Sequence, residues 1–151
     1  MRITFPAAAL ATVTLACAPA QAPMRTDLPE DLVAARGVVI QWSRKVAAGQ
    51  YDSLAALAAP DWRVIEGGKS SALPEYIGMV RGLHADSIRV EVDSTTAHTD
   101  AHFGYVQFTS HATVWTKGKG TLMREMGLAI VVREGAGWKM EVLIGSNAPP
   151  S

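Results

Sequence analysis

The chain has 151 residues, and its 14 Lys and Arg are balanced by 14 Asp and Glu, so the formal net charge at pH 7 is zero. No basic stripe or polybasic run stands out, which excludes the electrostatic signatures of nucleic-acid binding and of a charged membrane patch. The length is enough for one hydrophobic core but not for two, and a single cysteine, Cys17, excludes an intrachain disulfide.

The first 16 residues predict a signal peptide. Arg2 supplies a positive charge, and the uncharged run at 3–16 is shorter than the ~20 residues that a membrane-spanning helix needs. The segment Val13-Thr14-Leu15-Ala16-Cys17 resembles the lipobox of bacterial lipoproteins, in which the cysteine is lipidated and becomes the first mature residue, although Thr14 departs from the usual aliphatic residue. The alternative is an ordinary secretory signal cleaved nearby. We therefore expect export to the cell envelope, with a lipid on Cys17 as the only membrane attachment.

Helices come first in the remainder of the chain. Asp27 is predicted to cap a long helix that Pro29 opens and Gly49 ends, and a short second helix runs from Asp52 to just before Pro60. Outside the signal peptide at 1–16, we expect a flexible tether at 17–26, a folded domain at 27–146 and a disordered tail at 147–151.

Strands follow the helices. A short strand at 61–66 and a Gly67-Gly68 turn lead to a third helix after Ser71, and from Asp86 the apolar residues alternate with polar ones. Longer strands are predicted at about 101–116, 122–133 and 138–144, separated by glycine-rich hairpins at 117–120 and 134–137. Helices followed by an antiparallel meander indicate an α+β fold with the helices on one face of the sheet.

Two local features are expected within this series of strands. Gly104 and Gly127 are expected to mark bulges or kinks that curve the sheet. Residues 94–100 are interpreted as a hairpin turn, so that His98, Asp100 and His102 splay apart rather than bind a metal. We expect no metal site and no cofactor.

The order of these elements resembles the SnoaL-like branch of the nuclear transport factor 2-like superfamily, over nearly all of 29–146. The segments that carry the resemblance are Ala59-Pro60-Asp61-Trp62, Glu66-Gly67-Gly68 and Gly137-Trp138-Lys139-Met140. The resemblance implies a cone-shaped half barrel, in which a curved antiparallel sheet wraps around a pocket that the helices close. It often implies a homodimer through the outer face of the sheet. It implies no single activity, because the superfamily contains isomerases, dehydratases, cyclases and accessory domains.

The last strand bears on catalysis. Members of this branch often carry two inward-pointing histidines there, and the matching positions in this chain are Val142 and Ile144. A strict two-residue period places both on the face of Trp138 and Met140, which predicts an apolar wall suited to an apolar ligand. The alternative is a packed core without a pocket.

Ketosteroid isomerase-like chemistry would need a carboxylate base and a neutral donor. The candidate bases are Asp61, Glu66 and Glu125, and the candidate donors are Tyr51, Tyr76 and Tyr105. None of their spacings is diagnostic, and Glu125 is interpreted as an outward-facing strand residue. Asp61, Glu66 and His111 remain weak catalytic candidates.

Ligand contacts are predicted from three parts of the chain. The first set lies in elements expected near the cone mouth, and the last strand adds its two apolar wall residues. The remaining set shares one face of the long strand, which we expect to point inward although Val106, Phe108 and Val114 on the other face leave this open. The predicted contacts are Trp62, Tyr76, Met79, Tyr105, Gln107, His111, Val142 and Ile144.

The sequence therefore favours an exported domain that binds a small apolar molecule or an envelope partner without catalysis. The alternatives are an isomerase- or dehydratase-type enzyme with a carboxylate base and a Tyr or His donor, and a structural dimerisation module.

Overall fold

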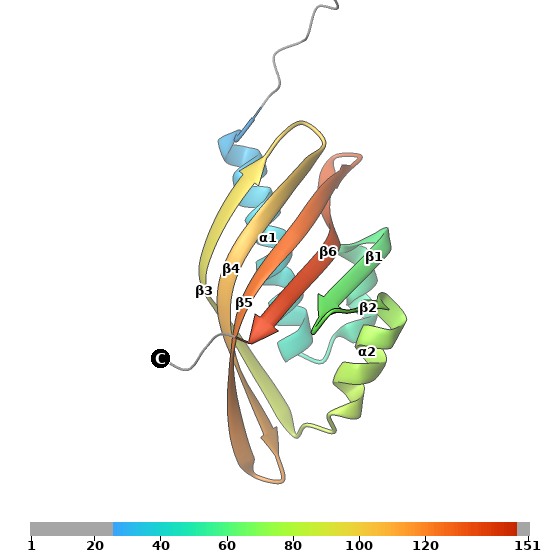
Figure 1. Ribbon diagram of the computed structural model, residues 1–151, viewed down its shortest axis with the longest axis vertical. Helices are drawn as coiled ribbons and strands as arrows, with labels where there is room; N and C mark the ends of the chain where they lie inside the picture. Colours follow the sequence, from blue (N-terminus) through green and yellow to red (C-terminus); the bar gives the residue numbers. More distant parts are fainter. Residues whose placement is uncertain (1–25, 148–151) are drawn as a thin grey trace, which may run out of the picture.

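The computed structural model describes residues 26–147, which form one six-stranded sheet with helices against one of its faces (Figure 1). Cys17, the predicted signal peptide and nearly all of the predicted tether lie outside the described residues. Within 26–147, no helix combines the length and the apolar character that crossing a membrane requires.

Helix α1 spans Pro29–Ala47 and is followed by a 3-10 helix, η1, at Tyr51–Ala56. The residues that α1 buries recur every three or four positions, so one face of the helix packs on the sheet: Asp31, Ala35, Val38, Val39, Trp42 and Val46. Gly49, at φ 67°, follows the helix end as expected. The predicted cap was wrong, because Leu28 is the N-cap residue and Asp27 accepts a hydrogen bond from the backbone N–H of Thr99 at 2.9 Å.

Strand β1 spans Ala58–Glu66, strand β2 spans Lys69–Ala72 and helix α2 spans Leu73–Gly82. Gly67 and Gly68, at φ 55° and 78°, form the predicted turn, but the strand that follows it was not expected from the sequence. Pro60 lies inside β1 rather than closing a helix.

Four long strands complete the fold: β3 at Ser87–Thr99, β4 at Phe103–Thr116, β5 at Lys119–Glu134 and β6 at Gly137–Asn147. The predicted turn at 94–100 was placed too early, because β3 continues to Thr99 past an irregularity at Asp93. The turn itself is held by Asp100, whose carboxylate accepts hydrogen bonds from the backbone N–H groups of His102 and Phe103, each at 2.7 Å.

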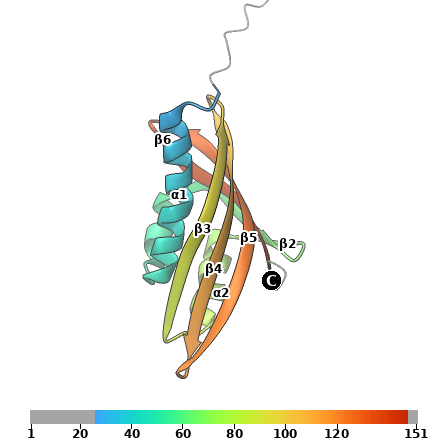
Figure 2. The ribbon, with the colours of Figure 1, turned by 90° about the vertical axis from the view of Figure 1, so that its left-hand side faces the viewer.

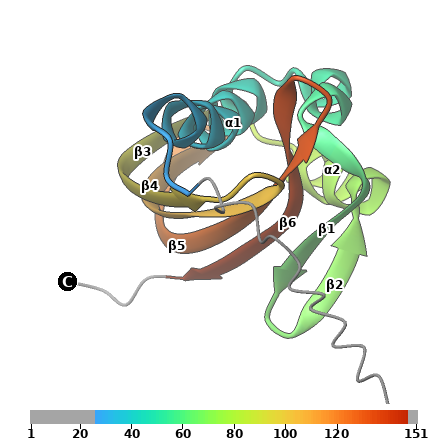
Figure 3. The same cartoon turned by 90° about the horizontal axis from the view of Figure 1, so that it is seen from above.

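The strand order is β2-β1-β6-β5-β4-β3. The first and the last strand of the chain, β1 and β6, are therefore neighbours inside the sheet. All neighbours pair antiparallel except β1 and β6, which pair parallel. The sheet is therefore mixed, where an antiparallel one was expected. It curves around α1, and α2 lies near its β1 and β6 side (Figures 2 and 3). The expected α+β, cone-like fold is confirmed.

The inner face of β4 is the opposite of the one predicted. Val106, Phe108 and Ser110 are buried on the helix side of the sheet. Because side chains alternate along a strand, Tyr105 and His111 point to the outer face.

A β-bulge in β6 changes the predicted inner wall. Met140 pairs with Val131 and Val142 pairs with Ile130, so Glu141 is an extra residue in β6. Such an insertion moves every later side chain to the other face. Leu143 is consequently buried beside Met140, whereas Val142 and Ile144 lie on the outer face, and their assignment to the inner wall was wrong.

Gly104 and Gly127 do not mark bulges, because the β4–β5 register runs past both without a shift. Gly127 instead makes room for an aromatic ring. A Cβ at this position would lie 2.7 Å from Cε2 of Phe108, and closer still to two other ring atoms. The glycine therefore allows Phe108 to lie flat across β5.

Candidate functional site

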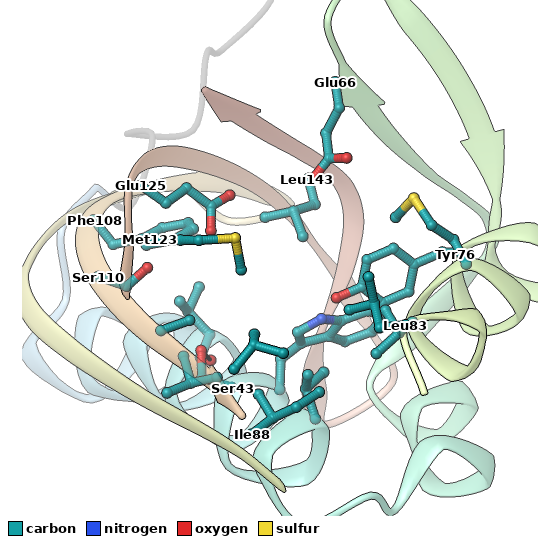
Figure 4. A pocket seen from close by; sticks show the side chains of 18 of the residues that line it. Ser43, Glu66, Tyr76, Leu83, Ile88, Phe108, Ser110, Met123, Glu125 and Leu143 are labelled. Carbon is teal, nitrogen blue, oxygen red and sulfur yellow. Dashed lines mark hydrogen bonds between the residues drawn. The ribbon is translucent and has the colours of Figure 1, made fainter. Parts of the chain in front are cut away.

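A cavity of about 180 Å³ lies between α1, α2 and the concave face of the sheet (Figure 4). An apolar cavity of about 150 Å³ is known to hold benzene, so this space suits a molecule of about one ring. Most of its lining is apolar and comes from both helices and four strands: Val39, Trp42, Val46, Tyr76, Met79, Val80, Leu83, Ile88, Val90, Phe108, Ala112, Val114, Met123, Met140 and Leu143.

Two carboxylates stand at one edge of this cavity. Glu125 on β5 and Glu66 at the end of β1 also line a broader depression beside it, which places them at the mouth. In Figure 4 both carboxylates point toward the space that the cavity residues enclose. Gly145 of β6 lies between them. A Cβ added to Gly145 would be 3.6 Å from Oε1 of Glu66 and closer still to Oε1 of Glu125.

Burial raises the pKa of the Glu125 carboxyl to about 7, and repulsion from the nearby Glu66 carboxylate adds to the rise. A carboxyl group with this pKa exchanges its proton near neutral pH, whereas an exposed glutamate is ionised there. Glu125 can therefore act as either a proton acceptor or a proton donor at the mouth of the cavity.

The Tyr76 hydroxyl points into the cavity from the side of α2 (Figure 4). Burial raises the pKa of Tyr76 to about 12; the indole of Trp42 acts in the opposite direction, and the carboxylates of Glu125 and Glu66 add to the rise. Tyr76 therefore stays a neutral hydrogen-bond donor over the physiological range.

Trp42 forms the aromatic base of the site. Its ring stacks on Trp62 with centroids 4.9 Å apart and contacts the Tyr76 ring at 5.9 Å. Trp42 is 4% exposed, and its indole N–H lies near enough to the Tyr76 hydroxyl to lower the pKa of Tyr76 but does not form a hydrogen bond of good geometry. A buried donor with a poorly formed hydrogen bond costs free energy, and an acceptor on a ligand could recover part of it.

The structure brings together only part of the predicted ligand set. Tyr76 and Met79 line the cavity, and Trp62 supports it from behind Trp42 without reaching the lining. The other five predicted contacts point away from the cavity, on the outer face of the sheet: Tyr105, Gln107, His111, Val142 and Ile144.

Of the three predicted catalytic candidates, one lies at the cavity and two do not. Glu66 is at the cavity mouth, but Asp61 is exposed and does not line the cavity. His111 lies on the outer face between two carboxylates of β3, with Nδ1 2.8 Å from Asp93 and Nε2 3.2 Å from Glu91. Within residues 26–147, no three metal-ligating side chains converge to hold a metal ion.

The sequence interpretation missed the inward direction of Glu125. Both faces of β5 carry apolar residues, so alternation alone could not orient the strand. Gly127 and Gly145 were the available signal, because two glycines on neighbouring strands leave the room that Phe108 and Glu125 occupy on the inner face.

Comparison with solved structures shows that the chain has the nuclear transport factor 2-like, cystatin-like fold. A protein assigned as a dehydratase of the nuclear transport factor 2-like family from Streptomyces avermitilis superposes with a TM-score of 0.71 at 13% identity, over 82% of this chain and 100% of that one. A nuclear transport factor 2-like protein from Novosphingobium aromaticivorans gives 0.70 at 17% identity, over 82% and 85% of the two chains.

A protein assigned as a ketosteroid isomerase from Shewanella frigidimarina gives a TM-score of 0.62 at 21% identity, over 75% of this chain and 94% of that one. Identities this low establish the shared fold and leave the activity open. No protein-family model matches the sequence, and a search of curated proteins returns no significant relative.

Proposed function

We propose that this domain binds a small, mostly apolar molecule in the cavity between its helices and its sheet. The observation that carries the proposal is the cavity itself, which has room for about one ring and is walled by apolar side chains from α1, α2, β3, β4, β5 and β6. The export that the first residues of the chain predict would place this binding in the cell envelope.

Filling the cavity should abolish binding. Ala112 lines the cavity from β4, and Ala112→Phe would put a ring into the space. The matched control is Thr113→Phe, the next residue on the same strand, which borders a depression on the outer face. We expect single-ring compounds found by ligand-observed NMR to bind the wild type and Thr113→Phe, and to bind Ala112→Phe at least tenfold more weakly.

Equal binding by the two phenylalanine variants would contradict the proposal. It would mean that the compounds attach elsewhere on the surface. Thermal unfolding of both variants shows whether Ala112→Phe has kept its fold.

A second candidate function is proton transfer on a bound substrate, and the observation that favours it is the position of Glu125. This carboxyl has a pKa of about 7 and shares the cavity with the neutral Tyr76 hydroxyl. A base poised near the working pH and a buried donor are the two groups that isomerisation or dehydration requires. The turnover rate would rise as the pH increases through 7, because the base must be ionised.

A substrate screen tests this candidate. Turnover should fall at least 100-fold in Glu125→Gln and should persist in Glu134→Gln, whose side chain is exposed at the end of β5. A rate that Glu125→Gln leaves unchanged would remove the enzymatic interpretation and keep the binding one.

A further inference from the structure

We infer that the cavity is built for an organic cation: a one-ring apolar body that carries a protonated amine, with the ring inside and the ammonium at Glu66 and Glu125. This inference rests on the proposed binding function and specifies its class of ligand. Three features of the site carry it: two neighbouring carboxylates without a counter-ion in the described part of the chain, an aromatic interior and a buried indole N–H without a hydrogen bond of good geometry.

The carboxylate pair lacks a counter-ion. Glu66 and Glu125 raise each other's electrostatic energy from either side of Gly145, as the effect of Glu66 on Glu125 shows. Among residues 26–147, no Lys, Arg or His side chain forms an ion pair with either of them. An ammonium bound between them would replace repulsion with two attractions.

The basic residue next to Glu125 in the chain is Arg124, which borders both the depression at the mouth and a depression on the outer face. Strand alternation sends its side chain to the opposite face from Glu125. Its cross-strand neighbour is His111, which also lies on that outer face. In agreement with this placement, Arg124 is not among the charges that shift the pKa of Glu125.

The interior of the cavity matches the rest of such a ligand. Trp42, Tyr76 and Phe108 give it aromatic walls, which accept an apolar ring and attract a nearby positive charge. The indole N–H of Trp42 is buried without a hydrogen bond of good geometry, so a ligand whose ring carries an oxygen would gain a further contact there. A ligand with a carboxylate would instead meet two like charges at the mouth.

Three nearly isosteric compounds test the inference by isothermal titration calorimetry on the purified protein at pH 8. They are 2-phenylethylamine, 2-phenylethanol and phenylacetate, which differ in charge but keep the same ring. We expect the amine to bind at least tenfold more tightly than the alcohol, and the carboxylate to bind more weakly than both. The preference for the amine should shrink as salt is added.

The outcomes separate the two proposals. If the alcohol binds as tightly as the amine, the cation inference is overturned and the apolar cavity stands. If none of the three compounds binds, the binding function and the inference are both overturned.

Substitutions at the mouth supply the second readout. Glu66→Gln and Glu125→Gln should each reduce the ratio of amine to alcohol affinity by several-fold, and the double variant should remove the preference. Glu134→Gln is the matched control, because this exposed glutamate lies at the hairpin end of β5 and does not line the cavity. A preference that survives in the double variant would contradict the inference.

The pH dependence has a defined sign. Glu125, which faces Glu66 and Tyr76, gains its negative charge as the pH rises through about 7. An aliphatic amine stays protonated in this range, because its pKa is about 10. The affinity of 2-phenylethylamine should therefore rise about tenfold between pH 6 and pH 8, while that of 2-phenylethanol stays constant. Parallel changes for both compounds would contradict a role of the carboxylate charge.

Discussion

Glu125 is the residue whose environment departs furthest from that of an ordinary surface glutamate. It is held among Met123, Phe108 and the glycine at 145, with another carboxylate beside it. Both effects stabilise the protonated form, so the folded protein binds a proton at this group more tightly than the unfolded chain does. Proton binding at Glu125 therefore changes both the folding stability and the charge of the site.

The sign of that linkage gives a prediction. The contribution of Glu125 is most favourable below pH 4.5, where the group is protonated in both states, and it is lost as the pH rises through about 7. Glu125→Gln should match the wild type at pH 5 and be more stable by about 2 kcal/mol at pH 8. Urea unfolding at the two pH values measures the difference.

Glu134→Gln serves as the reference for this experiment, because it removes one carboxylate from an exposed position. Its stability relative to the wild type should not change between pH 5 and pH 8. If Glu125→Gln behaves in the same flat manner, Glu125 does not carry the raised pKa.

Asp31 shows the contrasting case of a buried carboxylate with partners. Its Oδ1 accepts hydrogen bonds from Arg133 at 2.5 Å and from the indole of Trp138 at 3.2 Å. The guanidinium of Arg133 also lies over the Trp138 ring, 5.4 Å from its centroid. These contacts join the start of α1 to β5 and β6. The paired carboxylate of Asp31 thus fixes the helix on the sheet, whereas the carboxylate of Glu125, which has no cationic partner among residues 26–147, lies at the candidate site.

At the scale of the elements, the sequence predicted the types and order of most helices and strands. Alternation identified the four long strands, and the glycine pairs fixed the turns at 67–68, 117–120 and 134–137. Strand β2 was missed because four polar and small residues carry no apolar period. The parallel pairing of β1 with β6 was missed because it joins segments far apart in the chain.

Which face of each strand points inward was harder to predict. In β4 both faces are rich in apolar residues, since one packs on the helices and the other includes Tyr105 and Trp115. In β6 a bulge at Glu141 reverses the alternation, and no glycine or proline announces it. The lining of the cavity depends on which faces of β4 and β6 point inward. The sequence therefore predicted the fold, but of the site it placed only Tyr76, Met79 and Glu66 correctly.

At the scale of the whole molecule, the outer face of the sheet exposes apolar side chains that suit self-association. Leu122, Met126 and Ile144 are 57%, 52% and 37% exposed there, and a depression between Met126 and Ile144 hollows the face. Exposed apolar side chains grouped on one face are typical of an interface.

We expect the purified protein to dimerise through this face, and Met126→Lys to shift it toward the monomer. The matched control is Val33→Lys, because Val33 is 68% exposed on α1, away from the sheet. Sedimentation equilibrium of the three proteins over a range of concentrations measures the association. A wild type that stays monomeric, or a Val33→Lys variant that dissociates equally, would contradict this interface.

Gly145 also constrains how the sequence can change during evolution. A side chain at this position would occupy the place of the Glu125 carboxylate, although the two residues lie on neighbouring strands and twenty positions apart in the sequence. Descendants of a common ancestor that retain the acidic mouth must then retain glycine here, whereas lineages that abandon the acid are free to diversify. Paired inheritance of Glu125 and Gly145 would therefore trace which branches kept this chemistry.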